Sequence, residues 1–403
     1  MLSLSVLLLA SLVYGGHVVQ RENTCTVHPS GNFTDDSPAI IDAFSLCGQG
    51  GTIEFLNETY WIEKVMNTTG LNDVNINLRG TLLWSAQNIS YWLENSLPVG
   101  YQNQSSAWFL GGNNLVFKGY GYGTFDGNGQ IWYDFTKGVS NLAGRPHALT
   151  IWETNHSTFE GIRFVQSQMW SVSLWWSKIY HVNMTDIFVS STSNDSQQPA
   201  RNTDGADTID SHHIAFKRWE VHNGDDSIAM KRNSSDILIE DSVFFNGLGV
   251  AIGSIGQYPG EFEFVERVLT RNCSFIATRM VGYIKTWTGV QQGFPPNGGG
   301  GGTGLWTNST LSGITQAPAQ ITQCTTFSGA VGQCDTSTLQ ISNITWSGLE
   351  GSIAGTGIAI LKCSGAAPCE ELHIVDNAFT LSSNNSVGTY SCHAVASTEG
   401  FSC

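Results

Sequence analysis

The sequence predicts an all-β chain that folds as a single-domain, right-handed parallel β-helix of about ten coils with a short N-terminal capping helix. Three observations predict it. Short apolar runs of β type recur along the chain, polar turn residues separate them, and helical periodicity is hard to find after about residue 50. Only 13% of the 403 residues are charged and 45 are glycine, a composition that disfavours coiled coils and long solvated helices.

The β-type runs return at nearly regular intervals. They begin at Phe159, Ile179, Ile214 and Ile237, which are 20, 35 and 23 residues apart. The longest step contains a polar insert at 193–202. Such steps suit a solenoid whose coils each contribute several short strands. A β-sandwich or a propeller also has many short strands, but neither predicts this spacing.

Helix and turns are expected at defined places. Residues 37–47 have helical spacing of their apolar side chains, and this helix would cover the open end of the core, as solenoids require. Asparagines near strand ends, together with abundant glycine, suit tight turns because these residues tolerate left-handed backbone conformations. The stretch 288–338, which contains five consecutive glycines, is interpreted as a long surface loop.

The N-terminal residues 1–16 place an apolar run before small residues, as in a secretory signal peptide. They lack a basic beginning, so a short buried strand is the alternative. The catalytic domain would then span residues 17–403. Thirteen glycosylation sequons also favour export. The sequons are those of Asn32, Asn57, Asn67, Asn88, Asn103, Asn155, Asn183, Asn194, Asn233, Asn272, Asn308, Asn343 and Asn384.

Nine cysteines show no zinc-like spacing, so disulfides in an oxidising compartment are the better interpretation. Local pairs are expected and Cys273 is left over, although nothing in the sequence fixes this connectivity. The expected pairs are Cys25 with Cys47, Cys324 with Cys334, Cys363 with Cys369, and Cys392 with Cys403.

The net charge of −15 disfavours a nucleic-acid partner, because binding to a phosphate backbone needs clustered cations. After residue 16 no apolar stretch reaches the length of a membrane span. We therefore expect a secreted, extracellular monomer with no cofactor and no metal.

Three acidic side chains recur about one coil apart. Asp204 is in the segment Asn202-Thr-Asp-Gly, and Asp225 and Asp226 follow Gly224. Residues one coil apart stack at about 4.8 Å in a β-helix, so the three carboxylates would converge on one groove. One of them then acquires a raised pKa and can donate a proton while its neighbours act as bases, as glycoside hydrolysis requires. Turn residues or calcium ligands are the alternative, and Asp207 and Asp210 are interpreted as turn residues without a chemical role.

These motifs, followed by Ile284-Lys285-Thr286, resemble the active site of glycoside hydrolase family 28, the polygalacturonase family of pectin-degrading β-helix enzymes. The resemblance extends through most of the chain, and segments near Asp126 and Cys47 resemble the exo-acting fungal members. It implies that Asp225 is the general acid and that Asp204 and Asp226 position and deprotonate the attacking water. It also implies inversion of the anomeric configuration.

The chain departs from the polygalacturonases at two positions. They carry Gly-His-Gly where this chain has Leu248, and Arg-Ile-Lys where it has Tyr283 before Lys285. Tyrosine cannot replace the bidentate ion pair of arginine with a galacturonate carboxylate. The altered site suits a neutral, more apolar sugar such as rhamnose, which alternates with galacturonate in rhamnogalacturonan.

The sequence therefore predicts an exo-acting rhamnogalacturonan α-L-rhamnohydrolase whose partner is a pectic polysaccharide or oligosaccharide. Lys285 would bind galacturonate in the adjoining subsite, and Asn202, Tyr283, Leu248 and Trp287 are the other expected substrate contacts. The alternatives are an exo-polygalacturonase, a non-catalytic carbohydrate-binding β-helix, and a calcium-dependent lyase that uses the aspartates as metal ligands.

Overall fold

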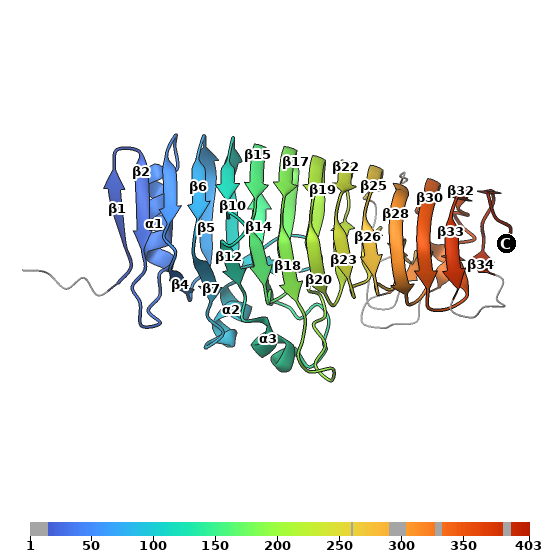
Figure 1. Cartoon of the computed structure of the whole chain (residues 1–403), viewed down its shortest axis with the longest axis horizontal. Coiled ribbons are helices and arrows are strands. Elements are labelled where there is room, and N and C mark those ends of the chain that lie inside the picture. Colours follow the sequence, from blue (N-terminus) through green and yellow to red (C-terminus); the bar gives the residue numbers. More distant parts are fainter. Residues whose placement is uncertain (1–14, 259–260, 290–303, 327–332, 382–387) are drawn as a thin grey trace, which may run out of the picture.

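The computed structural model describes residues 15–258, 261–289, 304–326, 333–381 and 388–403. Most of residues 1–16, the expected signal peptide, lies outside this part. The chain winds into an elongated stack of coils from one end of the molecule to the other (Figure 1). Successive strands join different ladders, and each coil returns to the ladder on which it began. This is the parallel β-helix that the sequence predicts.

Three ladders of parallel strands form the walls of the solenoid. The first consists of β5 (Met66–Asn72), β10 (Trp108–Asn113), β14 (Leu149–Trp152), the beginnings of β17 (Val172–Thr185) and β19 (Ala206–Lys217), β21 (Asp226–Met230), β24 (Gly249–Ile255), β27 (Gly282–Trp287), β29 (Ala319–Thr325), β31 (Gly357–Lys362) and β34 (Thr389–His393). The second consists of β2 (Thr24–His28), β3 (Thr52–Phe55), β6 (Asn75–Leu78), β11 (Val116–Lys118), β15 (Asn155–Glu160), the ends of β17 and β19, β22 (Ser234–Glu240), β25 (Val265–Arg271), β28 (Gly304–Ile314), β30 (Ser342–Ile353), β32 (Glu370–Val375) and β35 (Thr398–Glu399). The third consists of β4 (Thr59–Ile62), β7 (Thr81–Trp84), β12 (Thr124–Asp126), β16 (Arg163–Val165), β18 (Phe188–Ser191), β20 (Glu220–Asn223), β23 (Val243–Phe245), β26 (Ser274–Ile276), the ends of β28 and β30, and β33 (Ala378–Leu381).

The remaining elements lie at the end and on one side of the stack. Helix α1 (Ser37–Cys47) covers the N-terminal end of the core, as expected, and β1 (His17–Arg21) pairs antiparallel with β2. Helices α2 (Ile89–Asn95) and α3 (Gly129–Thr136) project from one side (Figure 1). The short strands β8 (Leu97–Pro98), β9 (Ser105–Ser106) and β13 (Pro146–His147) form a separate small sheet, and η2 (Cys334–Thr336) is a single 3₁₀ turn. None of the helices in the described ranges has the length and apolar character needed to cross a membrane.

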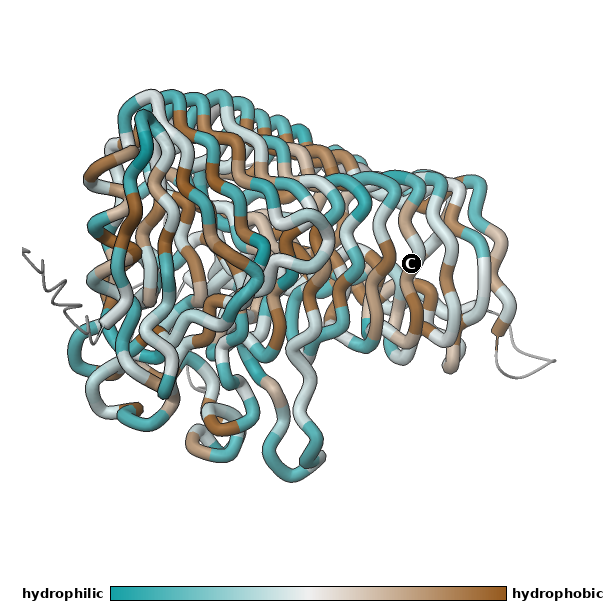
Figure 2. The backbone as a smooth tube through the Cα atoms, turned by 60° about the vertical axis from the view of Figure 1, so that its left-hand side comes forward, coloured by the Kyte–Doolittle hydropathy of each residue, from teal (hydrophilic) through white to brown (hydrophobic). Residues whose placement is uncertain are grey.

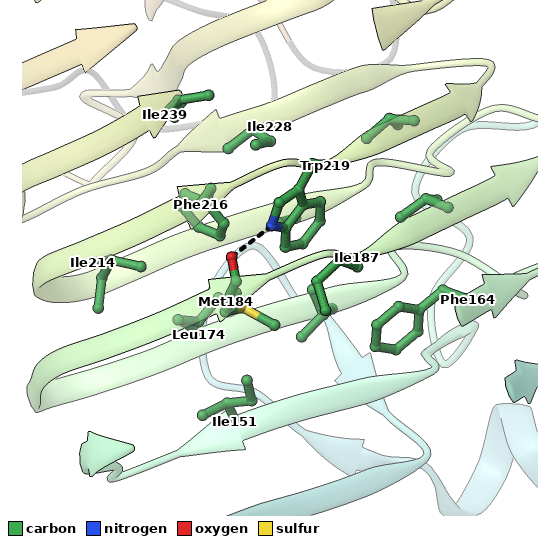
Figure 3. Packing of buried hydrophobic residues seen from close by; sticks show 14 of the residues in the cluster. Ile151, Phe164, Leu174, Met184, Ile187, Ile214, Phe216, Trp219, Ile228 and Ile239 are labelled. Atoms are coloured by element: carbon green, nitrogen blue, oxygen red, sulfur yellow. Dashed lines mark hydrogen bonds between the residues drawn. The ribbon is translucent and has the colours of Figure 1, made fainter. Parts of the chain in front are cut away.

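Buried side chains stack from coil to coil in the interior. In the second ladder Phe159 pairs with Met184, Met184 with Phe216, and Phe216 with Ile239. These residues belong to the β-type runs whose spacing predicts the solenoid. Beside them the indole N–H of Trp219 donates to the carbonyl oxygen of Met184 at 3.0 Å (Figure 3). The repeat in the sequence is therefore the repeat of the core.

Turns between the ladders use left-handed asparagines. Asn114, Asn233, Asn272 and Asn308 all have φ near +50°, a conformation that asparagine tolerates better than most residues. Hydrophilic residues follow the bends of successive coils (Figure 2). The expected role of asparagine at these turns is thus confirmed.

The prediction of a surface loop at 288–338 is wrong for part of this stretch. Residues 304–314 form β28 and residues 319–325 form β29, and both strands continue the ladders. Trp306, Ile314 and Ile321 are buried in the core, so these apolar residues outweigh the glycine- and serine-rich composition around them. Residues 290–303 and 327–332 lie outside the described part.

Four disulfides have the expected partners and link residues near one another in the sequence. They join Cys25 to Cys47, Cys324 to Cys334, Cys363 to Cys369, and Cys392 to Cys403. Cys273 is buried and has no disulfide partner among the described residues. The first bridge ties the end of α1 to β2 and so holds the cap on the core.

Truncating a stacked core residue tests this packing. We expect Phe216→Ala to lower the free energy of unfolding by about 3–5 kcal/mol, because it leaves a cavity between coils. Phe262 is 72% exposed, so Phe262→Ala should change it by less than about 0.5 kcal/mol. Guanidinium unfolding of both variants measures the difference, and similar losses would contradict the packing described here.

Candidate active site

Two rows of outward-facing side chains run along the first ladder. In one row Ser173 pairs with Asp207, Asp207 with Ala229, and the row continues through Ala251, Tyr283 and Gln320. We call this the aspartate row. Residues between the two rows, such as Met230, Ile252 and Ile284, point into the core. Because successive side chains of a strand alternate between its faces, the row residues point outward.

The second row, which we call the lysine row, lies two residues further along each strand. Lys231 follows Met230, and Met230 pairs with Ile252 of the next strand. The residue after Ile252 is Gly253, and Gly253 pairs with Lys285. The row then continues through Thr322, Lys362 and His393. Its side chains change from buried at Lys231, through half-buried at Lys285 and Thr322, to exposed at Lys362. The site is therefore enclosed toward the N-terminal coils and open toward the C-terminal coils.

The three predicted carboxylates lie together at the edge of this ladder. Asp204 precedes β19, Asp225 precedes β21, and Asp226 is the first residue of β21. One oxygen of each lies within 4.8 Å of the others. Asp204 and Asp226 are buried and Asp225 is half-buried. The sequence thus predicted the convergence correctly.

Asn202 positions Asp225 through its backbone. The Asn202 N–H donates to Oδ2 of Asp225 at 2.8 Å, and the Asp226 N–H donates to Oδ1 at 3.0 Å. The Asn202 side chain accepts from the backbone N–H of Asn141 at 2.9 Å. These contacts orient the carboxylate of Asp225, and the expected contact of Asn202 with substrate stays a prediction.

Two lysines and a tyrosine surround Asp226. Lys285 Nζ donates to Asp226 Oδ2 at 2.9 Å, and the Tyr283 hydroxyl donates to Oδ1. Lys231 Nζ lies 3.8 Å from Asp226 Oδ2 and 3.1 Å from Asp207 Oδ1. Two ammonium groups and one hydroxyl group therefore surround the Asp226 carboxylate and hold it in place.

Lys231 and Asp207 form a buried ion pair that the sequence reasoning missed. Interpreting Asp207 as a turn residue is wrong, since it lies in β19 and its carboxylate faces Lys231. Lys231 also donates to the Gly253 carbonyl oxygen at 2.9 Å. The signal was available, because a lysine at the end of the apolar run 228–230 must find a partner when that run is buried.

Burial and mutual repulsion shift the titration of these groups. Burial, Asp207 and the other two acids raise the pKa of Asp204 well above its usual value. Burial, then the charge of Asp226, raises the pKa of Asp225. Burial raises the pKa of Asp207 to about 7, although Lys231 opposes the shift. For Lys285 burial lowers the pKa, but Asp226 and Asp225 more than offset this and raise it. The site therefore combines carboxyl groups that retain protons with a lysine that stays charged.

A buried arginine adds a further cation near the acids. Arg145 donates from Nε to the Gln168 carbonyl oxygen, and its two terminal nitrogens have no hydrogen-bond partner among the described residues. Burial lowers its pKa to about 10, while Tyr133, Asp225 and Asp204 act to raise it. Its positive field acts on the acids without an ion pair. Sequence reasoning did not single it out.

Leu248 and Tyr283 belong to one small apolar cluster beside the acids. The cluster contains buried Ala229, Ala251, Met280 and Tyr283, and the half-buried Leu248 packs against it. Ala229 and Ala251 occupy consecutive positions of the aspartate row between Asp207 and Tyr283. Trp287 is 5% exposed, so its expected stacking on a sugar ring has little surface available. The neutral surface near the acids is provided by Leu248.

A wall of aromatic residues closes the N-terminal side of the site. Trp170, Trp175, Tyr101 and Ile209 form a buried cluster, and Lys231 Nζ lies 5.1 Å from the Trp170 ring centre. Two segments that are distant in sequence, one with Tyr101 and Gln102 and the other with Ser254 and Tyr258, contact each other beside this cluster. The Tyr101 hydroxyl donates to the Ser254 carbonyl oxygen at 3.0 Å, and the Gln102 N–H donates to the Tyr258 hydroxyl at 2.7 Å. The lysine row is thus covered on this side of Lys231.

Residues 59–403 match the family described as glycosyl hydrolases family 28. The chain belongs to glycosyl hydrolase family 28. It is therefore a glycoside hydrolase that acts on O-glycosyl bonds. The resemblance seen in the sequence motifs is confirmed.

Relatives within family 28 cover nearly the whole chain. Alpha-L-rhamnosidase rgxB of Aspergillus niger is 46% identical over 425 residues, which cover 100% of this chain and 96% of that protein. A putative galacturan 1,4-alpha-galacturonidase A of Aspergillus niger is 38% identical, with 94% of this chain and 93% of that protein covered. By their names, the first relative acts on α-L-rhamnosides and the second on galacturan.

The fold also resembles solved family structures. Endo-xylogalacturonan hydrolase from Aspergillus tubingensis superposes with a TM-score of 0.75 at 21% identity, covering 93% of this chain and 98% of that one. An exopolygalacturonase from Thermotoga maritima superposes with a TM-score of 0.58 at 14% identity, and 93% of each chain is covered. At such identities the likeness concerns the fold.

The raised pKa of Asp204 makes a prediction about stability. A carboxyl whose pKa is higher in the folded than in the unfolded state stabilises the fold at low pH, and this contribution is lost as the pH rises through the folded pKa. Asp204→Asn should therefore be more favourable to stability at pH 7.5 than at pH 4, because it removes a carboxyl whose ionisation is disfavoured in the folded state.

Guanidinium unfolding at the two pH values measures this effect. Asp42 is exposed on α1, and Asp42→Asn is the matched control that should leave the pH dependence unchanged. If Asp204→Asn keeps the pH dependence of the unmodified protein, Asp204 is ionised in the folded state without cost and the electrostatic description is wrong.

Proposed function

We propose that this family 28 protein is a secreted, exo-acting rhamnogalacturonan α-L-rhamnohydrolase that releases rhamnose from the non-reducing end. The observation that carries the proposal is Leu248, the half-buried member of the apolar cluster beside the three acids. A 6-deoxy sugar presents a methyl group, which gains from apolar contact. A galacturonate at the same place would present a carboxylate, which loses hydration without gaining a cation there.

The contacts of Tyr283 support this choice of sugar. Its hydroxyl is engaged by Asp226 and by Lys285 Nζ at 3.2 Å. It therefore offers neither a positive charge nor a free donor to a sugar carboxylate. Alpha-L-rhamnosidase rgxB, by its name, acts on rhamnosides, and its 46% identity supports the same assignment.

Asp225 is the proposed general acid. It is the half-buried member of the three acids, and burial of its carboxyl, followed by the charge of Asp226, raises its pKa. It gives a proton to the glycosidic oxygen as the bond to the anomeric carbon breaks. Asp226 accepts a proton from the attacking water, and Asp204, which keeps its own proton, helps to position that water, so that one proton is donated and one recovered in each turnover.

Lys285 is proposed to bind the galacturonate on the other side of the cleaved bond. An ammonium group has three donors, and contacts with Asp226 and Tyr283 use two of them. Its side chain is 21% exposed, which leaves one donor for a sugar carboxylate. An alternating polymer supplies this carboxylate next to the terminal rhamnose.

The enclosed N-terminal side of the site favours exo action. The aromatic wall covers the lysine row before Lys231, and the contacts Tyr101–Ser254 and Gln102–Tyr258 extend this cover to the next strand, β24. A polymer therefore has room to continue only toward the exposed C-terminal coils. The sugar at the closed side is the terminal one, and this agrees with release of a monosaccharide.

Export and glycosylation at the thirteen sequons belong to the same proposal. Four disulfides suit an oxidising compartment. The sequons of Asn57, Asn67 and Asn103 lie on exposed residues, where a glycan can be accommodated. Mass spectrometry of the secreted protein before and after deglycosylation identifies the occupied sites.

An exo-polygalacturonase is the second candidate. It is favoured by Lys285, which can bind an acidic sugar, and by the 38% identity to a putative galacturonidase. A calcium-dependent lyase is less favoured, because Lys285 and Lys231 already compensate the charge of Asp226. Unsaturated products and loss of activity in EDTA would identify the lyase.

Product analysis tests the proposed substrate. We expect free rhamnose from rhamnose-terminated rhamnogalacturonan oligosaccharides and no galacturonic acid from oligogalacturonides. Asp225→Asn should reduce turnover by about 10²–10⁴-fold, which is the usual contribution of general acid catalysis, while oligosaccharide binding persists. Asp42→Asn is the control and should retain full activity. Galacturonic acid as the main product would favour the second candidate, and no product from either substrate would favour a binding protein.

The anomeric form of the product is a separate prediction. Inversion should give β-rhamnose first from an α-linked substrate, as followed by proton NMR during early turnover. One oxygen of each acid lies within 4.8 Å of the others, closer than the usual separation of about 6.5–9.5 Å in inverting enzymes. Inversion therefore requires the water to sit at the edge of the cluster. Initial α-rhamnose would show retention instead and would make one of the aspartates a nucleophile.

A further inference from the structure

The lysine row continues beyond the cleavage site toward the open end. Lys285 on β27 pairs with Thr322 on β29, and Thr322 pairs with Lys362 on β31. We infer that Lys362 is a second carboxylate-binding residue, which takes the next galacturonate along an alternating galacturonate–rhamnose chain. This inference rests on the proposed function and extends its binding site by two sugars.

The spacing of the lysines carries the argument. Neighbouring strands lie about 4.8 Å apart, so Lys285 and Lys362 are separated by two strands, or roughly 10 Å. Lys231 stands the same two strands before Lys285 in this row. One linked pyranose advances a sugar chain by about as much as one strand spacing. A cation on every second strand therefore matches a negative charge on every second sugar.

The strand between the two lysines is neutral. β29 contributes Thr322 to the lysine row and Gln320 to the aspartate row, next to Tyr283. The Gln320 Oε1 atom is buried and has no hydrogen-bond partner in the described part of the chain. Along the lysine row, β27 therefore carries a cation, β29 a neutral side chain and β31 a second cation. A rhamnose fits the neutral position at Thr322, because a neutral sugar leaves no charge without a partner there.

Lys362 is available for such a contact. Lys231 and Lys285 are committed to acids of the site, whereas Lys362 is exposed and makes no ion pair among the described residues. Its row neighbour His393 pairs with Asp335 at 2.7 Å, and Asp335 also accepts from the Gly365 N–H at 2.9 Å. The charge of Lys362 is therefore free to meet a carboxylate, on a protein whose net charge of −15 otherwise repels polyanions.

Kinetics on two chain lengths test the inference. The substrates are the disaccharide rhamnose–galacturonate and the tetrasaccharide that repeats it, each with rhamnose at the non-reducing end. Lys362→Gln should lower kcat/KM for the tetrasaccharide by about two- to five-fold, as for an exposed ion pair, and leave the disaccharide unchanged. The loss should shrink in high salt, since screening lengths are about 8–10 Å at 0.1–0.15 M.

The control is Lys118→Gln, which removes an exposed lysine on β11 of the second ladder. It should change neither substrate. If Lys362→Gln leaves the tetrasaccharide unaffected, or reduces both substrates equally, Lys362 is not a binding residue for the second galacturonate and the inference is overturned.

A binding measurement separates this inference from the proposed function. In the Asp225→Asn background, calorimetry compares the tetrasaccharide with its counterpart whose reducing-end galacturonate is methyl-esterified. Lys362 should favour the free acid by about two- to five-fold, and Lys362→Gln should abolish this preference. Absence of rhamnose release by the unmodified enzyme would overturn the proposed function alone, whereas absence of the preference would overturn the role of Lys362.

Discussion

The hydrogen-bond register between successive parallel strands is the constraint on which the rest of this structure depends. It places each residue of a coil about 4.8 Å from its counterpart in the next coil, and so converts separations of about 20–35 residues into direct contact. Apolar residues become continuous stacks in the interior. Polar residues on the outer face become rows, and the pair Asp207–Lys231 and the cluster around Asp226 follow from the same register.

Electrostatics in the site follow from that placement. Acids brought together and partly buried cannot all ionise freely, so the pKa of Asp204 and of Asp225 rises. Lys231, Lys285 and Tyr283 lie around the Asp226 carboxylate. After burial, the charge of Asp226 is the largest influence that raises the pKa of Asp225, so Asp225 keeps its proton to a higher pH. Division of labour between chemically identical groups thus comes from their partners.

Much of the fold and of the site could be predicted because the signals are local. The spacing of β-type runs predicts the solenoid, and the motifs around Asp204 and Asp225 predict the converging acids. Strands β28 and β29 could not be predicted in the same way, since a glycine- and serine-rich composition masks a few widely spaced core residues such as Trp306.

What sequence reasoning missed depends on contacts between distant segments. The hydrogen bond between Tyr101 and Ser254 joins residues 153 positions apart, and no local sequence pattern indicates this contact. The sequence singles out Asn202 as a residue of the site, but it does not reveal that the backbone N–H of Asn202 orients Asp225. Side-chain type alone does not reveal which atom of a residue is used, and only the turn geometry decides it.

A crystal structure of the Asp225→Asn variant with the rhamnose-terminated tetrasaccharide tests the central claim most directly. The account predicts the terminal rhamnose against the acids with its methyl group toward Leu248, the next galacturonate on Lys285, and the chain running toward Lys362. A chain that runs past Trp170 toward the N-terminal coils, or a galacturonate whose carboxylate lies against Leu248, would contradict it.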